Sequence, residues 1–188
     1  MRLLRVVVRE IIDWAKGDAT PTMSSLPGSE GEHELQHKYK TDLQALAFYK
    51  HQMLDHLNSL MRAFIAGQDM MFVGTADRRG YAHTSFRAGP AGFVRVLNEK
   101  TLAYPEYKGN GVMSSLGNIH ENPRVGLMFV DFAGDRIGLH VNGKAHIVEN
   151  EEFAHLLNGQ SAAPAHSAPA DVANSKLPTV ERWVVVSV

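Results

Sequence analysis

The sequence predicts a mainly β fold with flanking helices, an α+β fold, whose sheet is an antiparallel barrel. Short apolar stretches alternate with hairpin turns, of which residues 77–80, Asp-Arg-Arg-Gly, are the clearest. Helical periodicity dominates before residue 67 and gives way to a strand pattern after it. Residues 180–188 predict an apolar strand, which would be an exposed edge unless it paired inside a barrel or with a second subunit. Short strands joined by hairpins favour an antiparallel barrel over a parallel doubly wound sheet.

Length and composition indicate one globular domain with a substantial core. The chain has 188 residues, 44% of them apolar, which argues against global disorder. A net charge of −1 argues against a general nucleic-acid binder but is compatible with a local basic pocket for one phosphate. The sequence has no cysteine, which excludes disulfides, thiolate metal sites and cysteine nucleophiles, and we expect a cytoplasmic protein. No apolar run is long enough to span a bilayer.

The first 32 residues are expected to form a helical arm and a linker. Residues 1–14 predict a short amphipathic helix, because charged side chains interrupt any signal-peptide core. Residues 17–32 are rich in Gly, Ser, Pro and Thr, which is typical of a linker. The main domain, with its own N-terminal helices, is expected over residues 33–188. Packing of the arm on a partner subunit and peripheral contact with a membrane both stay open.

Helices are predicted over residues 33–66. Thr41 followed by Gln44 has the pattern of a capping box, and Gly67 suits a C-terminal cap. Residues 58–59 are expected to divide the segment into two helices. Apolar residues recur at near-helical spacing and predict one buried face. This face consists of Leu43, Leu46, Met53, Leu57, Leu60, Met61, Phe64 and Ile65.

From residue 70 the pattern predicts hairpins, a connecting helix and a final strand. Turn residues separate these elements, and the Ala/Pro/Ser-rich stretch at 161–175 is expected to be a loop. The predicted strands cover residues 70–76, 81–87, 93–97, 101–104, 124–132, 136–148 and 180–188. The predicted helices cover residues 112–121 and 151–157.

Residues 104–113, Tyr-Pro-Glu-Tyr-Lys-Gly-Asn-Gly-Val-Met, follow a strand and open a helix. A helix N-terminus offers unpaired backbone N–H groups and the positive end of the helix dipole, which suits a phosphate. Gly109 and Gly111 let the backbone approach a ligand, Lys108 adds a positive charge, and Asn110 can cap the helix or donate a hydrogen bond. The spacing of a Walker motif is absent. The alternative interpretation is an ordinary capped loop.

A second candidate lies near the end of the strand predicted at 81–87. Strand alternation puts His83, Ser85 and Arg87 on one face. A hydroxyl beside a guanidinium is a good clamp for a phosphate. His83 is also a candidate acid or base, because imidazole titrates near neutral pH. The alternative is a solvated outer face with a surface histidine and arginine, and no catalytic residue is assigned.

Two histidine pairs raise the question of a metal site. His33 and His37 are four residues apart in a predicted helix, and His140 and His146 have the same parity in one strand. Neither pair has a third ligand at a recognised spacing, so we expect no metal site. The Gly-x-Ser-x-Gly pattern of a nucleophile elbow is also absent.

Five motifs follow one another in a distinctive order across residues 71–148. They are Phe-Val-Gly-Thr-Ala-Asp-Arg-Arg-Gly at 72–80, Thr-Ser-Phe-Arg-Ala-Gly-Pro-Ala-Gly-Phe-Val-Arg-Val at 84–96, Leu-Ala-Tyr-Pro-Glu-Tyr-Lys-Gly-Asn-Gly at 102–111, Asn-Ile-His-Glu-Asn-Pro-Arg-Val-Gly-Leu-Met-Phe at 118–129, and Val-Asn-Gly-Lys-Ala-His at 141–146. Taken together they resemble the pyridoxamine 5′-phosphate oxidase-like family of FMN-binding split barrels. The resemblance implies an antiparallel split β-barrel of the FMN-binding type.

The resemblance also implies a homodimer with FMN in each of two clefts at the subunit interface, and an FMN-dependent oxidoreductase acting on a small, unidentified substrate. The phosphate should meet the strand end near Arg87 and the stretch 108–112, while the ring should lie beside residues 84–86 and near two tyrosines. The partner subunit should contribute from its long hairpin or from the last strand around Trp183, for which a core position is the alternative. The implied FMN-binding residues are Thr84, Ser85, Phe86, Arg87, Tyr104, Tyr107, Lys108, Asn110, Gly111, Val112 and Trp183.

The sequence departs from the family at its C-terminal end. True pyridoxamine-phosphate oxidases carry an arginine-rich segment there, whereas residues 183–188 read Trp-Val-Val-Val-Ser-Val. We therefore expect a substrate other than pyridoxamine phosphate, and a truncated end is an open alternative. Two other functions also stay open. One is an oxidoreductase that uses the deazaflavin F420, and the other is a non-catalytic module that binds flavin or haem, with His140 or His146 as an axial ligand.

Overall fold

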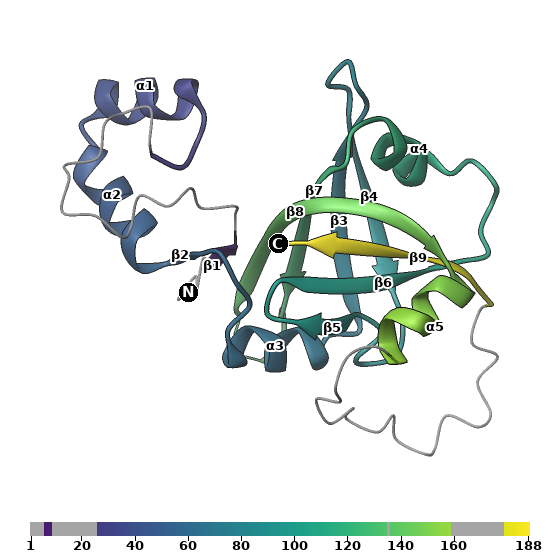
Figure 1. Ribbon diagram of the computed structural model, residues 1–188. Helices are drawn as coiled ribbons and strands as arrows, with labels where there is room; N and C mark the ends of the chain where they lie inside the picture. Colours follow the sequence, from purple (N-terminus) through teal and green to yellow (C-terminus); the bar gives the residue numbers. More distant parts are fainter. Residues whose placement is uncertain (1–5, 9–25, 135, 159–178) are drawn as a thin grey trace.

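The computed structural model describes residues 6–8, 26–134, 136–158 and 179–188, and within them five helices flank a mostly antiparallel sheet (Figure 1). The helices are α1 (Glu30–Tyr39), α2 (Asp42–His51), α3 (Ser59–Ala66), α4 (Ser114–Glu121) and α5 (Asn150–Asn158). The strands are β1 (Val6–Val8), β2 (Met53–Leu54), β3 (Met70–Ala76), β4 (Ala82–Ala88), β5 (Arg95–Asn98), β6 (Thr101–Tyr107), β7 (Arg124–Val130), β8 (Gly138–Glu149) and β9 (Val180–Ser187). None of the described helices has both the length and the apolar character needed to cross a bilayer.

The main path of the sheet has the strand order β4-β3-β7-β8-β9-β6-β5, and each neighbouring pair along it is antiparallel. β4 lies at one end of this path and β5 at the other, so backbone hydrogen bonds do not close the sheet within the described residues. The antiparallel split barrel predicted from the sequence is confirmed.

The last strand, β9, lies inside the sheet. Val186 pairs with Leu102 of β6 on one side and with Ala145 of β8 on the other. Its side chain and that of Val184 are fully buried. Pairing on both sides satisfies the backbone groups that an apolar edge strand would leave exposed. Of the two alternatives left open for this strand, the structure shows pairing inside the barrel.

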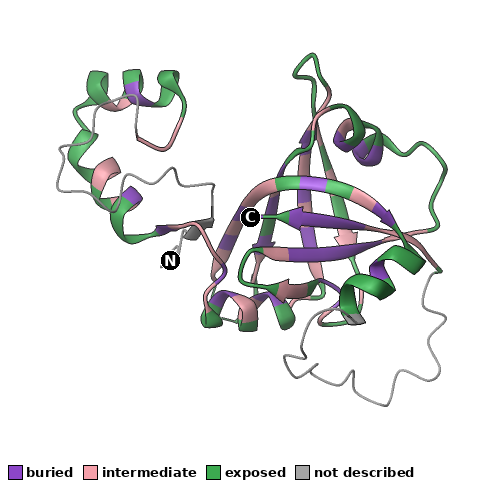
Figure 2. Ribbon diagram, in the orientation of Figure 1, coloured by how far each residue is buried: buried purple, intermediate pink, exposed green. Residues whose placement is uncertain are grey.

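Strand alternation divides the buried apolar residues into two clusters on opposite faces of β9. Figure 2 shows the buried stretch of β9, residues 184–186, in purple. Val184 and Val186 belong to the main core inside the barrel, together with Phe129 of β7. Val185 belongs to a smaller cluster, where Phe153 of α5 packs. Each fully buried side chain of this size stabilises the fold by about 1.5–3 kcal/mol, so the larger cluster is the main source of stability.

α3 agrees with its predicted pattern. Asn58 is its N-cap, and the side-chain oxygen accepts a hydrogen bond from the backbone N–H of Met61 at 3.0 Å. Gly67 ends the helix, as predicted. Leu57, Met61 and Ile65 are buried in the main core, so this helix covers one end of the barrel (Figure 1).

The predicted buried face of the helical region is wrong at two positions. Leu43 of α2 and Leu60 of α3 are 80% and 79% exposed. Periodicity identifies the apolar side of a helix, but burial also needs an element opposite that side. α1 and α2 lie beside the barrel rather than on the sheet (Figure 1). The predicted capping box is wrong as well, because Thr41 makes no side-chain capping bond and its hydroxyl donates to the carbonyl of Gln36.

The N-terminal segment is a strand where the structure describes it. Val6–Val8 form β1, which pairs in parallel with residues 139–141 of β8 and with β2. The amphipathic helix predicted over residues 1–14 is therefore wrong at these positions. Three consecutive β-branched side chains favour extended backbone, and β8 provides the pairing edge. The remainder of that predicted helix, most of the predicted linker and the loop at 161–175 lie outside the described residues.

β6 extends further than the predicted strand at 101–104. It continues through Pro105 to Tyr107, although proline has no N–H to donate to a ladder. Pairing with β9 carries the strand onward, because Glu106 lies opposite Arg182 and Tyr107 opposite Val180. The extension matters for function, since it puts Glu106 in the sheet.

A charged cluster joins the β5–β6 hairpin to the loop before α3. The Asp55 carboxylate lies 2.9 Å from Lys100 Nζ and 2.9 Å from His56 Nδ1. Hydrogen bonds from His56 and then from Lys100 lower the pKa of Asp55 from 3.8 to about 2. Because the folded-state pKa lies below the unfolded value, this contribution to stability is present above about pH 4 and is lost as the pH falls to about 2.

We expect Asp55→Asn to remove this contribution. About half of the Asp55 side chain is exposed, so solvent screening limits the effect to about 1 kcal/mol. Urea unfolding should show the wild type more stable than the variant by this amount at about pH 6, and the two equally stable at about pH 2. A stability difference that stays constant between these pH values would contradict the assignment.

Candidate functional site

Two polar contacts hold the buried face of α4 against β3 and β4. The hydroxyls of Ser85 and Ser115 lie 2.9 Å apart, and the Asn118 side-chain amide donates to the Thr75 hydroxyl at 3.0 Å. Ser115 and Thr75 are both buried. Because buried hydroxyls need hydrogen-bond partners, these two bonds fix which residues of the helix face the strands.

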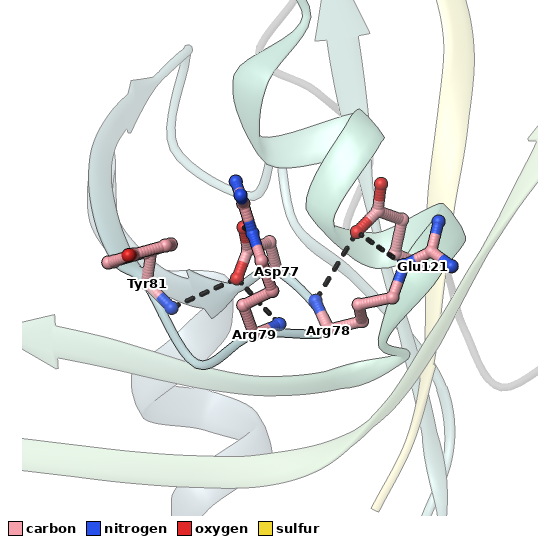
Figure 3. Close-up of polar contacts among 5 residues, drawn as sticks. All are labelled: Asp77, Arg78, Arg79, Tyr81 and Glu121. Atoms are coloured by element: carbon pink, nitrogen blue, oxygen red, sulfur yellow. Dashed lines mark hydrogen bonds and ion pairs between the residues drawn. The ribbon is translucent and has the colours of Figure 1, made fainter.

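The C-terminal end of α4 is tied to the β3–β4 turn (Figure 3). Glu121 accepts hydrogen bonds from the backbone N–H and from Nε of Arg78, at 3.3 and 3.4 Å. These bonds, the backbone one first, lower the pKa of Glu121. Asp77 organises the turn itself, because one of its oxygens accepts from the N–H groups of Arg79 and Tyr81. With this end anchored, α4 directs its N-terminus toward the C-terminal end of β4.

The N-terminus of α4 is uncapped. Met113, the N-cap residue, has left-handed backbone (φ 56°) and makes no side-chain capping bond. Asn110 Oδ1 accepts from the N–H of Val112 at 3.0 Å, which shapes the loop before the helix. Gly111 has φ 80°, and a Cβ added to it would meet no described atom within 4 Å. The loop is therefore open above Gly111, and the first turn of α4 keeps the N–H groups that attract an anion.

Arg87 and Glu106 form an ion pair across the open side of the barrel. Nη2 and Nε of Arg87 lie 2.7 and 3.0 Å from one carboxylate oxygen of Glu106. Their side chains are only 19% and 13% exposed, so this attraction is screened less than in a surface pair. β4 is one edge of the sheet, and β6 lies next to the opposite edge strand. The pair therefore joins two strands that backbone hydrogen bonds leave apart.

Arg182 lies on the same face of the sheet, opposite Glu106 in the β6–β9 ladder. Its Nη1 is 3.9 Å from the sulfur of Met113, so the guanidinium reaches the N-cap of α4. Its Nη2 is 3.7 Å from the Glu181 carboxylate. We name this end of the barrel the mouth. It comprises Ser85, Arg87, Glu106, Met113, Ser115 and Arg182.

Tyr104 lies inside the barrel, two residues before Glu106 and on the same face of β6. Its side chain is fully buried, and its hydroxyl has no hydrogen-bond partner in the described part of the chain. Burial, and then the negative charge of Glu106, raise the pKa of this hydroxyl, while Arg87 lowers it. The hydroxyl is therefore a neutral donor that the described residues leave unused.

The residues predicted from the strand at 84–87 divide between the two faces of β4. Ser85 and Arg87 face the mouth, as the alternation predicts. Thr84 and Phe86 lie on the outer face, where Phe86 is 53% exposed and its ring centroid is 5.8 Å from that of Phe72. A single chain does not bring these four residues together at one point.

The remaining predicted residues lie around the mouth or away from it. Tyr107, which is half-buried, ends β6, and its hydroxyl is 2.9 Å from where a Cβ on Gly89 would lie. Burial raises the pKa of Tyr107. Residues 108–112 are exposed in the loop before α4. Trp183 points away from the mouth, because it stacks on Phe153 of α5 with 3.9 Å between ring centroids.

The histidine pairs differ in their surroundings. His33 is buried, whereas the side chain of His37 is exposed. On β8, His140 is half-buried and His146 is exposed. Across the ranges that the structure describes, no group of three or more His, Cys, Asp or Glu side chains is arranged to hold a metal ion.

Sequence reasoning did not identify Glu106, Ser115 or Arg182 as site residues. Glu106 and Arg182 share the strand parity of Tyr104 and Val184, and this alternation is the signal that could have placed them on the inner face. Their position opposite each other depends on the β6–β9 register, which local sequence does not specify. For Ser115 the sequence carries no comparable signal.

The mouth can bind an anion. The first turn of α4 and the Arg182 guanidinium offer hydrogen-bond donors, and one of the two mutually bonded serine hydroxyls keeps its O–H. The helix dipole adds positive potential. The carboxylate of Glu106 is neutralised by Arg87. A donor set of this kind suits a phosphate group.

Comparison with known proteins gives one family and several solved structures. The family model described as Pyridoxamine 5′-phosphate oxidase matches residues 57–183, and no curated protein matches the chain. Among solved structures, HupZ of Group A Streptococcus is 18% identical, and the match covers 69% of this chain and 87% of that one with a TM-score of 0.49. An FMN-binding protein from Syntrophomonas wolfei is 11% identical, with coverage of 82% and 93% and a TM-score of 0.43. The heme storage protein HutZ from Vibrio cholerae is 15% identical, with coverage of 70% and 88% and a TM-score of 0.40.

Proposed function

The chain belongs to the pyridoxamine 5′-phosphate oxidase family, and on this premise we propose that it binds FMN at the mouth of the barrel and acts as an FMN-dependent oxidoreductase on a small substrate. The observation that carries the proposal is the position of the Arg182 guanidinium, which contacts Met113 at the uncapped N-terminus of α4. This donor set recognises a phosphate, which FMN carries at one end. Family membership supports the flavin, and the donor set supports its phosphate at this end of the barrel.

The residues present fit an FMN phosphate. The space above Gly111 is open, so a ligand can approach the backbone there. Lys108 adds an exposed positive charge in the same loop. Asn110 uses its side-chain oxygen within the loop, which leaves its amide N–H groups available as donors.

The chain's own residues would bind and orient the cofactor. When bound, FMN supplies electron or hydride transfer at its isoalloxazine ring. The phosphate donors at the mouth would fix one end of the molecule. Thr84 and Phe86, on the outer face of β4, would provide a hydroxyl and an apolar surface for the ring, and a second subunit on that face would exclude water from it.

We propose that the second subunit packs on the outer face of β3, β4 and β7. Phe72 pairs with Phe86 on one side and with Met128 on the other, and we name these three residues the apolar strip. Phe86 and Met128 are 53% and 39% exposed. Gly74 and Gly126 pair with each other beside the strip, and neither has a side chain that would project from the sheet there. An exposed apolar strip on a sheet face is typical of a protein–protein interface.

An absorbance spectrum of the purified protein tests the cofactor. We expect the bands of oxidised flavin, and mass spectrometry of the molecule that heat releases should give the mass of FMN. A colourless protein that also fails to take up added FMN would overturn the proposal. A Soret band would replace FMN with haem, and the mass of F420 would replace it with the deazaflavin.

Anaerobic reduction tests the reaction class. NADH, NADPH or a chemical reductant should bleach the flavin bands, and a small oxidant should restore them. Bound FMN that no reductant bleaches would contradict the oxidoreductase assignment while leaving FMN binding in place.

A further inference from the structure

The two arginines of the mouth differ in how far their donors are already used. All three nitrogen atoms of Arg87 donate hydrogen bonds, two to Glu106 and one to the carbonyl of Phe86. Turning this guanidinium toward a ligand would leave the Glu106 carboxylate charged, largely buried and unpaired, which is strongly unfavourable. Arg87 is therefore committed to the protein itself.

Arg182 keeps most of its donor capacity. Its Nη1 lies 3.9 Å from Met113 Sδ, which is a weak acceptor. Its Nη2 is 3.7 Å from the partly exposed Glu181 carboxylate, which is longer than a hydrogen bond and is screened by solvent. In the described structure no ion pair joins it to Glu149, its neighbour on β8. Arg182 therefore carries a charge at the N-cap of α4 that the protein does not fully use.

The Tyr104 hydroxyl is a second, independent sign of a ligand group near the mouth. It is fully buried, and it has no hydrogen-bond partner among the described residues. It lies on the same face of β6 as Glu106, two residues earlier, and the charges of Glu106 and Arg87 both affect its pKa. A buried donor without a partner is unfavourable, and a polar group from outside the chain would satisfy it.

We propose that Arg182, and not Arg87, binds the FMN phosphate, and that Glu106 holds Arg87 as a latch between β4, one edge of the sheet, and β6, the strand next to the other edge. The proposal rests on the proposed function for its ligand, and it replaces the expectation that the phosphate meets Arg87. Arg182 is the binding residue, whereas Arg87 and Glu106 are positioning residues. The latch fixes the distance from β4 to β6 and, through β6, to Arg182 on β9.

Comparing FMN with riboflavin isolates the phosphate contact, because riboflavin lacks only that group. Arg182→Gln should weaken FMN binding about ten- to a hundredfold, the loss expected for one charge-assisted hydrogen-bonded contact. Riboflavin binding should be unchanged. Arg124→Gln, at an exposed arginine that begins β7, is the matched control and should leave both affinities unchanged. Fluorescence titration of the wild type and both variants with each ligand measures these affinities, and wild-type FMN affinity in Arg182→Gln would overturn the assignment.

A double-mutant cycle tests the latch. Arg87→Met and Glu106→Leu each leave one charge unpaired, so each should lower the melting temperature by several degrees, and the double variant should recover most of that loss. The two apolar side chains of the double variant can pack across the same gap and keep β4 beside β6, so Arg182 should stay in place and FMN should bind within about threefold of the wild type. Recovered thermal stability with FMN affinity lowered about tenfold or more would show that Arg87 contacts the phosphate, which overturns the proposal.

The wild-type titration separates failure of this inference from failure of the proposed function. A wild type that binds neither FMN nor riboflavin overturns the proposed function, and the assignment of Arg182 with it. A wild type that binds FMN more tightly than riboflavin, together with an Arg182→Gln variant that does the same, overturns only the assignment of Arg182.

Discussion

Replacing Gly143 with alanine should destabilise the protein by about 3 kcal/mol, at the upper end of what overpacking costs. A Cβ at this position would lie 2.2 Å from the backbone oxygen of Ser187 and 2.9 Å from Val186 Cγ1. Gly143 adjoins the point where β8 begins to pair with β9, at Lys144 opposite Ser187. Relief of the clash would therefore require the two strands to separate where the barrel depends on their ladder. Urea unfolding followed by circular dichroism measures the effect.

Gly117→Ala is the matched control for this prediction. Gly117 lies in the middle of α4, and a Cβ added there would meet no described atom within 4 Å. The same substitution should therefore stabilise the protein by about 0.5–1 kcal/mol, because alanine loses less backbone entropy in a helix. A Gly143→Ala variant as stable as the wild type would show that the β8–β9 register differs from the one described.

Phe86→Glu should raise the dissociation constant of the proposed dimer about a hundredfold or more. Phe86 is at the centre of the exposed outer face of β4, next to Phe72. An interface on this face would bury the new carboxylate without a partner, which is strongly unfavourable. Sedimentation velocity over a range of concentrations measures the change. Because the ring of FMN is proposed to lie at the same interface, FMN affinity should fall together with dimer affinity.

Leu60→Glu controls for the charge itself, since Leu60 is 79% exposed on α3 and is not part of the apolar strip. This variant should remain dimeric. If Phe86→Glu is folded and dimerises as well as the wild type does, the second subunit packs elsewhere and the proposed interface is wrong.

Local signals explain why much of the fold could be predicted from the sequence. The β3–β4 turn needs a left-handed residue, which Gly80 provides with φ 87°, and an acceptor for its own N–H groups, which Asp77 provides. Every contact needed there lies within a few residues. β3 accordingly has the predicted bounds, Met70–Ala76. The N-cap of α3 at Asn58 is local in the same way.

Pairing between distant segments explains what the sequence did not predict. Val6–Val8 are a strand because β8, more than a hundred residues later in the sequence, provides an edge for them. β6 passes through Pro105 because β9 pairs with it. Leu60 belongs to an apolar helix face, but no neighbouring element in the described structure covers it. Helical periodicity and strand propensity contain none of this information.

The candidate site likewise combines features that local sequence predicts with contacts between distant segments. Alternation alone put Ser85 and Arg87 on one face of a strand, and the structure agrees. Their partners, Ser115 and Glu106, lie 30 and 19 residues further along the chain, and Arg182 reaches Met113 across 69 residues. Those contacts depend on strand register and on how α4 packs against β3 and β4, and both are tertiary properties.

Native mass spectrometry of the purified protein incubated with FMN would count chains and flavins in a single experiment. We predict a species that contains two chains and two FMN molecules, because we propose one phosphate site at each mouth and an interface that completes the cleft for the ring. A folded protein that carries no FMN under these conditions, whether as a monomer or as a dimer, would contradict FMN binding at the mouth of the barrel.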